Sequence, residues 1–554
     1  MLPTSTNVTI EVKTALPNDA EAVVCFVAQG GKISGDISMV LGSAEFEEMQ
    51  RMIKFGIVRG KPREVDFDLL ESPPGKFRRL YLAGLGDANK MTGDTIRQAA
   101  GALVRVIRKH RLKRVAVVPP VIHHGREALG TQLATEGMLL AAFKYDEYRG
   151  TGQKEDDDEK GDAKKSKQPA RVTLISSKSA VKAIQAAVNR AQFLCDAQNF
   201  ARTIAFRPGN DVNPPRLAQI AQQAAKEVGL TCRVLDEKQM KRLGMGGILA
   251  VGGGSPNTPP RMIVLEWKGS GRKTRIEDGE SRMAKGVKRR SGSPSSILHS
   301  PSSPLLLVGK AITFDTGGIS IKPALNMQDM VFDKCGAMAV LGAMVAIARL
   351  KLPVPVVGIM AAAENHISST AYRPGDILRM YNGVTVEVTN TDAEGRLVLG
   401  DALAWGIETY KPAAVVDLAT LTGAMVIALG FTHCGVFGNN DKLVAELDGA
   451  AQRAGERIWR LPLTEDHKDL LKSEVADLKN SQPRDAGSIK GALFLSYFVP
   501  RGGSLPWCHM DIAGVADTDK ELPYYGKGAT GWGVRTLVHW CEARAGVLPH
   551  GHEG

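Results

Sequence analysis

The chain has 554 residues, of which 43% are hydrophobic and 23% are charged, with a formal net charge of +12. This length is too great for one ordinary core, so we expect two domains, and the composition is that of a soluble globular protein rather than a disordered or fibrous one. No apolar run approaches the ~20 residues that cross a bilayer, and seven scattered cysteines without zinc-site spacing favour reduced thiols in the cytoplasm.

The N-terminal segment carries no signal for export. It has no basic region followed by an apolar one, and its first 24 residues hold acidic residues but no Arg. A secretory or transit peptide is therefore not expected.

Residues 1–178 are predicted to form an N-terminal α/β domain with a largely parallel sheet. Apolar, β-branched runs alternate with helical stretches, an order typical of this class. The predicted strands cover 22–28, 78–85, 114–122 and 171–176, and the predicted helices cover 94–110 and 128–145. A loop at 153–169, with six acidic and five basic residues, is expected to be disordered.

A long helical stretch at 179–205 is expected to link this domain to the next. The Pro-containing turns of FRPGNDVNPP follow it and end the helix. Residues 206–554 then alternate strand and helix again, which predicts a larger α/β domain. Several of its strands are continuous apolar runs, as expected for strands buried on both faces, and AVLGAMVAIARL at 339–350 is predicted to be a buried helix.

A basic low-complexity insert is predicted at 268–304. It holds nine Lys and Arg residues against three Asp and Glu residues, so it carries +6 of the net +12. Its Ser, Pro and Gly content favours a disordered, solvated loop. A nucleic-acid-binding arm is the less favoured alternative.

Several charged residues follow the apolar strand predicted at 303–309. Lys310 follows that strand directly, and Asp315 comes five residues later. Lys322 and Asp333 follow a Gly-Gly pair that permits a tight turn. Charged groups at the ends of buried strands in an open α/β sheet lie where ligands bind.

A second charged stretch, NTDAEGRL at 390–397, contributes Asp392, Glu394 and Arg396. With the first stretch it supplies four carboxylates, which cannot all stay ionised in one buried site without compensation. Two divalent metal ions could provide that compensation. A network of salt bridges is the alternative, and spacing alone does not separate the two.

Several motifs closely resemble the leucyl aminopeptidase family, the cytosol aminopeptidases, which are dinuclear metallopeptidases. They are VGKAITFDTGGISIKP (308–323), NTDAEGRL (390–397), DLATLTGA (417–424), ERIWRLPL (456–463), ADLKN (476–480), HMDIAG (509–514) and KGATGWGVR (527–535). The resemblance covers roughly residues 195–545 in register. The N-terminal half is similar only in its general α/β character.

The resemblance implies a metal-dependent aminopeptidase with peptide substrates and a bridging water that attacks the first peptide bond. The implied ligands of two divalent ions (Zn²⁺ or Mn²⁺, with Mg²⁺ an option at one site) are Lys310, Asp315, Asp333, Asp392 and Glu394. The implied catalytic cations are Lys322 and Arg396, the latter holding a bicarbonate that acts as general base. Asp392 and Glu394 are then expected to alternate along an extended backbone, so that both can point to the same side.

A pocket for the first side chain of the substrate is implied in the same way. Its residues would be Met330, Thr420, Leu421, Gly423, Ala513 and Ala516. Together they describe an apolar pocket for Leu- or Met-like residues with broad preference, although ordinary core packing would explain them singly.

The family also implies a homohexamer. Lys334 departs from the family, where Met is usual, and is expected to place an extra cation near the site. An aminopeptidase that also binds nucleic acid through the basic insert is the second hypothesis.

Overall fold

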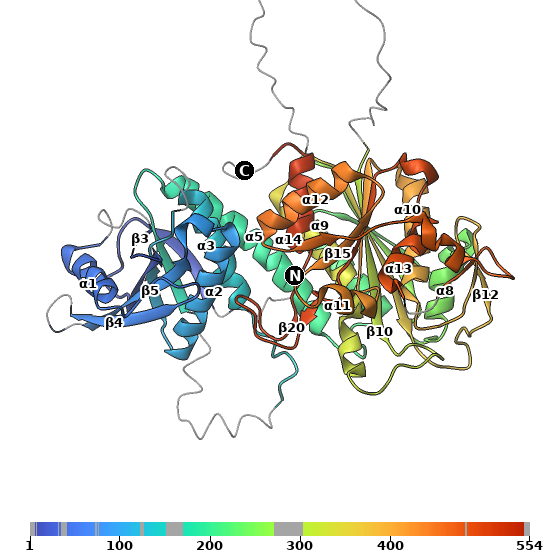
Figure 1. Ribbon diagram of the computed structural model, residues 1–554, viewed down its shortest axis with the longest axis horizontal. Helices are drawn as coiled ribbons and strands as arrows, with labels where there is room; N and C mark the ends of the chain where they lie inside the picture. Colours follow the sequence, from blue (N-terminus) through green and yellow to red (C-terminus); the bar gives the residue numbers. More distant parts are fainter. Residues whose placement is uncertain are drawn as a thin grey trace, which may run out of the picture.

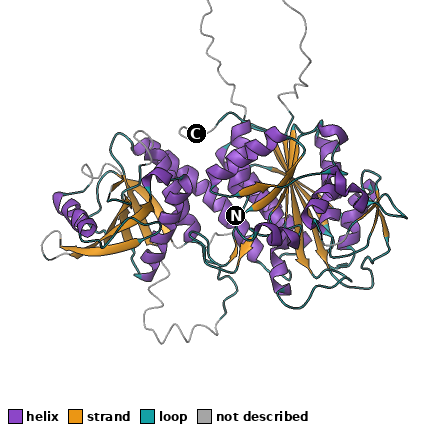
Figure 2. Ribbon diagram, viewed as in Figure 1, coloured by secondary structure: helices purple, strands orange, loops and turns teal. Residues whose placement is uncertain are grey.

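The computed structural model describes residues 6, 8–31, 33–34, 41–71, 75, 77–121, 127–150, 170–270, 303–481 and 485–547. It shows two α/β domains, the C-terminal one larger, and so confirms the predicted fold class (Figures 1 and 2). The loop predicted at 153–169 and nearly all of the insert predicted at 268–304 lie outside the described residues.

The N-terminal domain is built on a mixed seven-stranded sheet. Its strands are β1 (Val8–Lys13), β2 (Ala22–Ala28), β3 (Ile33–Ser34), β4 (Val65–Glu71), β5 (Phe77–Gly86), β6 (Arg114–Val117) and β7 (Ala170–Ile175). They lie in the order β1-β7-β6-β2-β5-β4, with β3 on β2. The path from β1 to β5 is parallel, whereas β4 and β3 pair antiparallel.

Helices cover both faces of this sheet. They are α1 (Ser43–Lys54), α2 (Gly93–Lys109) and α3 (Glu127–Ala141), with the short η1 (Ala88–Lys90) before α2. Apolar residues of α2 and α3 share one buried cluster with the sheet, and those of α1 share another. The predicted strand at 114–122 is shorter in the structure, because the prolines at 119 and 120 lack the N–H that a sheet ladder needs.

Helix α5 (Val181–Phe206) runs between the domains. It packs against α3 on one side and against α9 (Cys335–Leu350) of the larger domain on the other. Its C-terminal half is almost continuously buried, including Arg202.

The larger domain has an eight-stranded mixed sheet. Its strands are β8 (Thr231–Leu235), β9 (Arg261–Trp267), β10 (Leu305–Asp315), β11 (Val356–Asn365), β14 (Ala414–Ala419), β15 (Cys434–Gly438), β16 (Ile458–Arg460) and β18 (Trp507–Asp511). The order is β16-β15-β18-β14-β10-β11-β9-β8. The four central strands, β18, β14, β10 and β11, are parallel.

Two small sheets and two layers of helices complete this domain. The small strands are β12 (Ile377–Arg379), β13 (Thr385–Glu387), β17 (Leu478–Lys479), β19 (Asp517–Thr518) and β20 (Gly528–Ala529). One face of the main sheet carries α5, α6 (Pro214–Val228), α9, α12 (Asp441–Ala454) and α14 (Val534–Arg544). The other carries α7 (Glu237–Leu243), α8 (Gly246–Gly252), α10 (Gly395–Tyr410) and α13 (Gly487–Ser496). The remaining pieces are α11 (Gly423–Leu429), η4 (Met327–Lys334), η5 (Glu465–Leu471) and η6 (Arg501–Gly503).

The continuous segment Met327–Leu350 is the one described helix long and apolar enough to cross a membrane. Its most apolar window is 83% buried inside the protein, and the sheet and α5 cover it. It is a core helix, as predicted for residues 339–350.

Candidate metal centre

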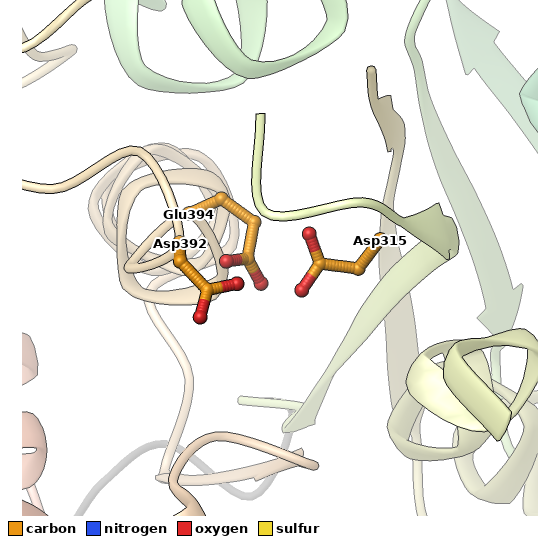
Figure 3. Close-up of side chains that lie close together, drawn as sticks. All are labelled: Asp315, Asp392 and Glu394. Carbon is orange, nitrogen blue, oxygen red and sulfur yellow. The ribbon is translucent and has the colours of Figure 1, made fainter. Parts of the chain in front are cut away.

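Three carboxylates converge at the C-terminal ends of the parallel strands. Asp315 ends β10, Asp392 lies in the turn before α10, and Glu394 is the residue that precedes α10. One oxygen from each lies within 4.8 Å of the others, and Figure 3 shows the three groups pointing toward one another. Asp315 and Glu394 are each only 2% exposed.

A bulge in β10 lets Lys310 and Asp315 share one side of the strand. In a regular strand, residues five apart point to opposite faces. The pairing of β10 with β11 shifts between Ile312 and Asp315, where one extra residue of β10 is accommodated. One extra residue reverses the alternation, so the side chains of Lys310 and Asp315 both reach the cluster.

Lys310 brings Asp333 of η4 into the group. Its Nζ lies 2.8 Å from Asp333 Oδ1 and 2.7 Å from Glu394 Oε1, and it donates to the carbonyl oxygen of Thr420 at 2.9 Å. Three acceptors thus use all three protons of the ammonium group. Burial opposes this charge, but Asp333 and Glu394 outweigh it and raise the pKa of Lys310.

The loop after β10 folds back so that Lys322 reaches the same carboxylates. Lys322 Nζ lies 2.8 Å from Asp315 Oδ2 and also contacts Asp392. Gly317 and Gly318 make this turn with φ of +86° and +66°. A Cβ atom on Gly318 would approach the Thr391 hydroxyl to 2.8 Å, so the Gly-Gly pair is needed for both its backbone angles and its lack of side chains.

The negative charge of the cluster is only partly balanced by its positive charge. Four carboxylates face the two ammonium groups of Lys310 and Lys322. Burial raises the pKa of Asp333 to about 8 and that of Asp392 to about 6, and Glu394 adds to both shifts. Asp333 Oδ2 is buried without a hydrogen-bond partner. Buried, under-compensated oxygen ligands of this kind fit hard divalent metal ions.

Arg396 lies in the first turn of α10, almost fully buried. Its Nη1 donates to the carbonyl oxygen of Asn480 at 2.8 Å, while its Nε has no hydrogen-bond partner. Burial lowers its pKa, with Glu394 opposing that shift. An arginine fork with a free edge beside a carboxylate cluster can hold a planar anion.

The extended backbone expected for Asp392 and Glu394 is wrong. Asp392 lies in a turn in which its N–H donates to the Asn390 side chain at 2.8 Å, and Glu394 has helical angles of φ −79° and ψ −36°. The side chain of Asn390 competes with strand pairing. The two carboxylates therefore converge through a turn followed by a helix start.

The residues predicted for the substrate pocket follow three of the central strands. Met330 lies in η4 after β10; Thr420, Leu421 and Gly423 follow β14; and Ala513 and Ala516 follow β18. Thr420 also donates its hydroxyl to Asp333 Oδ1 at 2.6 Å. Because these strands are parallel, their following loops lie at the same edge of the sheet as the carboxylates.

Three buried polar residues support the site without having been singled out from the sequence. Asn365 donates to Asp315 Oδ1 at 2.8 Å, and the Asn480 side chain accepts the Thr389 N–H at 2.8 Å. Asp511 accepts the N–H groups of Leu421 and Ala513 at 3.1 and 3.2 Å. Asn480 and Asp511 stand in ADLKN and HMDIAG, but neither motif indicates which backbone groups they hold.

Lys334 does not add a cation to the cluster as expected. Its Nζ donates to the carbonyl oxygens of Arg207 and Val331 at 2.9 and 2.5 Å. No described carboxylate lies within ion-pair distance of it, and burial lowers its pKa to about 7. Its ammonium group is directed to the C-terminal end of α5.

Family models match both domains of the chain. The model described as "Cytosol aminopeptidase family, catalytic domain" matches residues 199–279 and 282–538. The model described as "Cytosol aminopeptidase family, N-terminal domain" matches residues 40–151. The second match extends the resemblance into the half of the chain where only a general α/β character was recognised.

Relatives over most of the chain carry the same family name. A "Probable cytosol aminopeptidase" of Cenarchaeum symbiosum is 39% identical, covering 89% of this chain and 92% of its own. Another, of Roseiflexus castenholzii, is also 39% identical, covering 91% and 96%. Among solved structures, the bottromycin maturation enzyme BotP in complex with Mn is 31% identical, with a TM-score of 0.76, covering 95% of this chain and all of its own.

Proposed function

The chain belongs to the cytosol aminopeptidase family of peptidases, and from this premise we propose that it releases N-terminal residues from peptides with two divalent metal ions. The observation that carries the proposal is the cluster of Asp315, Asp392 and Glu394, whose oxygens lie within 4.8 Å of one another. Asp333, joined to it through Lys310, supplies the fourth carboxylate.

The proposed ligands of the two ions are Lys310, Asp315, Asp333, Asp392 and Glu394. When bound, the ions supply Lewis acidity that activates water and polarises the peptide carbonyl. Lys310 can act as a nitrogen ligand only after it loses the proton that its carboxylate partners now stabilise. The metal-bound protein should therefore hold Lys310 as a neutral amine.

Lys322 and Arg396 are the cations that we assign to the reaction. Lys322 is partly exposed beside Asp315 and Asp392, so its ammonium group can stabilise the negative charge that develops on the carbonyl oxygen. The unpartnered edge of Arg396 suits a bicarbonate ion, which would take up the proton that the attacking water loses.

The finer properties of the enzyme are part of the same proposal. We expect the residues that follow β10, β14 and β18 to form a pocket for a Leu- or Met-like residue. BotP was solved with Mn, so Mn²⁺ is the first metal to test, with Zn²⁺ beside it. A homohexamer in the cytoplasm is the expected state of the protein. Nucleic-acid binding is not carried forward, because no observation favours it.

The proposal is tested by hydrolysis of L-leucine amide. Chelation should abolish the reaction, Mn²⁺ or Zn²⁺ should restore it, and N-acetyl-leucine amide should not be cleaved because it lacks a free α-amine. Lys322→Met should lower kcat by about 100-fold or more, whereas Lys442→Met, at an exposed lysine of α12, should not. Equal cleavage of the acetylated substrate would exclude an aminopeptidase.

A further inference from the structure

A cavity of about 230 Å³ lies at the seam between the two domains, and none of its lining residues belongs to the carboxylate cluster. Its walls come from α2, from the C-terminal end of α3 and the residues just after it, from α5, and from the segment between β19 and β20. Figure 1 shows the region labelled β20 between α2 and the larger domain.

The wall of this cavity is strongly basic. Its charged residues are Arg105, Arg108, Lys144, Arg202, Lys527 and Glu521. The single carboxylate, Glu521, pairs with Arg105 at 3.0 Å, and Lys144 pairs with Asp146 at 3.4 Å. Among the described residues, no ion pair is formed by the other three cations. Within the part of the chain that the structure describes, the cavity therefore has an excess of positive charge that an anionic ligand could balance.

The two guanidinium groups that form no ion pair with a described residue, those of Arg108 and Arg202, are held at the same helix end. Arg108 Nη1 donates to the carbonyl oxygen of Ala141, and Arg202 Nη1 donates to that of Leu140, each at 3.1 Å. Both carbonyls belong to the last turn of α3. These contacts fix the positions of both groups on the cavity wall before any ligand arrives.

Arg202 is a buried cation with unused hydrogen-bonding capacity. It is fully buried, and its Nε donates to the carbonyl oxygen of Ala529 at 2.9 Å. Its Nη2 has no hydrogen-bond partner. A buried charge without a counter-ion is costly, so an anion in the cavity would reduce that cost through its opposite charge.

The same cavity has an aromatic side. The Arg202 guanidinium lies 3.9 Å from the ring centroid of Phe143. The rings of Tyr145 and Phe206 stack with centroids 4.7 Å apart, and all three aromatic residues line the cavity. A ligand that carries a flat organic group beside its negative charge could contact this surface.

We propose that this cavity binds a small phosphate-bearing anion. Arginine forks recognise phosphate oxygens through paired, charge-assisted hydrogen bonds. The exposed Arg108 can offer such a fork, and the buried Arg202 adds positive charge behind it. The exposed Lys527 adds charge at the cavity. Recognition rests on the phosphate group, and the aromatic side favours an organic phosphate over the inorganic ion.

The test is calorimetric titration of the metal-loaded full chain with adenosine monophosphate and, separately, with inorganic phosphate. Arg108→Ala should weaken binding of both by at least about tenfold, because it removes a charge-assisted contact. Lys109→Ala removes the same charge from the next residue of α2, which does not line the cavity, and should change binding by less than about twofold. Lys527→Ala removes the charge of a second residue that lines the cavity and is exposed, so it should also weaken binding.

Tighter binding of adenosine monophosphate than of phosphate supports use of the aromatic side, and equal binding supports recognition of the phosphate alone. Three results would overturn the proposal. They are no binding of either ligand, binding that Arg108→Ala and Lys527→Ala leave unchanged, and binding of an acidic peptide in place of both phosphates.

Discussion

Gly395 makes room for the side chain of Lys310 in the metal centre. A Cβ atom at residue 395 would lie 2.7 Å from Lys310 Cε and 2.8 Å from its Nζ. These distances are below ordinary van der Waals contact, and Lys310 is fixed by Asp333, Glu394 and Thr420. The glycine of NTDAEGRL is therefore needed for space, since its own backbone starts a regular helix.

Gly395→Ala should displace Lys310 and lower both metal affinity and kcat/KM for L-leucine amide by at least about tenfold, which corresponds to ~1.4 kcal/mol. Gly449→Ala in α12 is the matched control, because its new Cβ would meet only the flexible end of Arg453 at 3.4 Å. Metal content by mass spectrometry and steady-state kinetics measure the effect. An alanine variant with full activity would show that Lys310 has freedom to move.

At the scale of single residues, the sequence predicts which charged side chains belong to the site. It predicts less well the backbone conformation that brings them together. Asp315, Asp392 and Glu394 were predicted together, and their oxygens do converge. The turn that joins Asp392 to Glu394 was missed, because it depends on the hydrogen bond that the Asp392 N–H donates to the Asn390 side chain. Asn365 was also missed, since a buried amide on a strand has no distinctive spacing.

Helix α10 is anchored by one buried carboxylate. Asp401 accepts the N–H groups of Ile248 in α8 and of Tyr381 after β12, at 3.0 and 2.8 Å. The helix begins directly after Glu394, so this anchor helps to fix the orientation of the metal-binding end. Burial raises the pKa of Asp401 to about 7, against the effect of the backbone N–H groups of Ile248, Tyr381 and Gly247.

Asp401→Asn should change how stability depends on pH. The pKa of Asp401 is raised above its usual value of about 3.9, so between about pH 4 and 7 the folded state binds more protons than the unfolded state. The free energy of unfolding of the wild type should therefore fall as pH rises through this range. Relative to the wild type, the asparagine variant should gain stability from pH 4 to 7 in urea titrations. A constant difference would contradict the raised pKa.

Elements were predicted well where their apolar pattern is strong. The strand β2 and the helix α2 agree with their predicted ranges within one residue. Five N-terminal elements, β1, β3, α1, β4 and η1, were not predicted. β4 is an antiparallel edge strand with Asp66 and Asp68 in its sequence, and edge pairing tolerates such polar residues because one side faces solvent. The bulge in β10 was missed, because bulges depend on the partner strand.

The two domains are joined by a buried ionic contact. Glu136 of α3 accepts a hydrogen bond from Arg97 Nε of α2 at 2.7 Å and lies 3.7 Å from Arg535 Nη1 of α14. All three side chains are fully buried. Burial opposes ionisation of Glu136, but the two arginines outweigh it and lower its pKa to about 2.

Glu136→Gln should destabilise the whole molecule by about 3–5 kcal/mol, because it leaves the buried Arg97 without its carboxylate partner. Glu127→Gln, at an exposed position in the first turn of the same helix, should cost little. In the wild type the stabilisation by Glu136 is complete above about pH 4.5 and is lost as pH falls toward 2. Denaturant unfolding from pH 7 to 2 measures both effects. Equal stability of the two variants would contradict the coupling.

At the scale of the molecule, two α/β domains could be predicted from the order of elements, and the larger one from its longer run of apolar strands. The contacts between the two domains could not be predicted from the sequence. Glu136 and Arg535 are 399 positions apart in the chain, and no local pattern of charge or hydropathy connects residues so distant. The cavity at the seam was missed for the same reason.

The central claim is that the carboxylate cluster holds two metal ions on which peptide hydrolysis depends. Its most direct test is a titration of metal-stripped protein with Mn²⁺, with bound metal and L-leucine amide hydrolysis measured on the same samples. Activity should be absent without metal and should rise until two ions are bound per chain, while Asp392→Asn should bind fewer ions and stay inactive. Full hydrolysis by the metal-stripped protein, or full activity of Asp392→Asn, would contradict the claim.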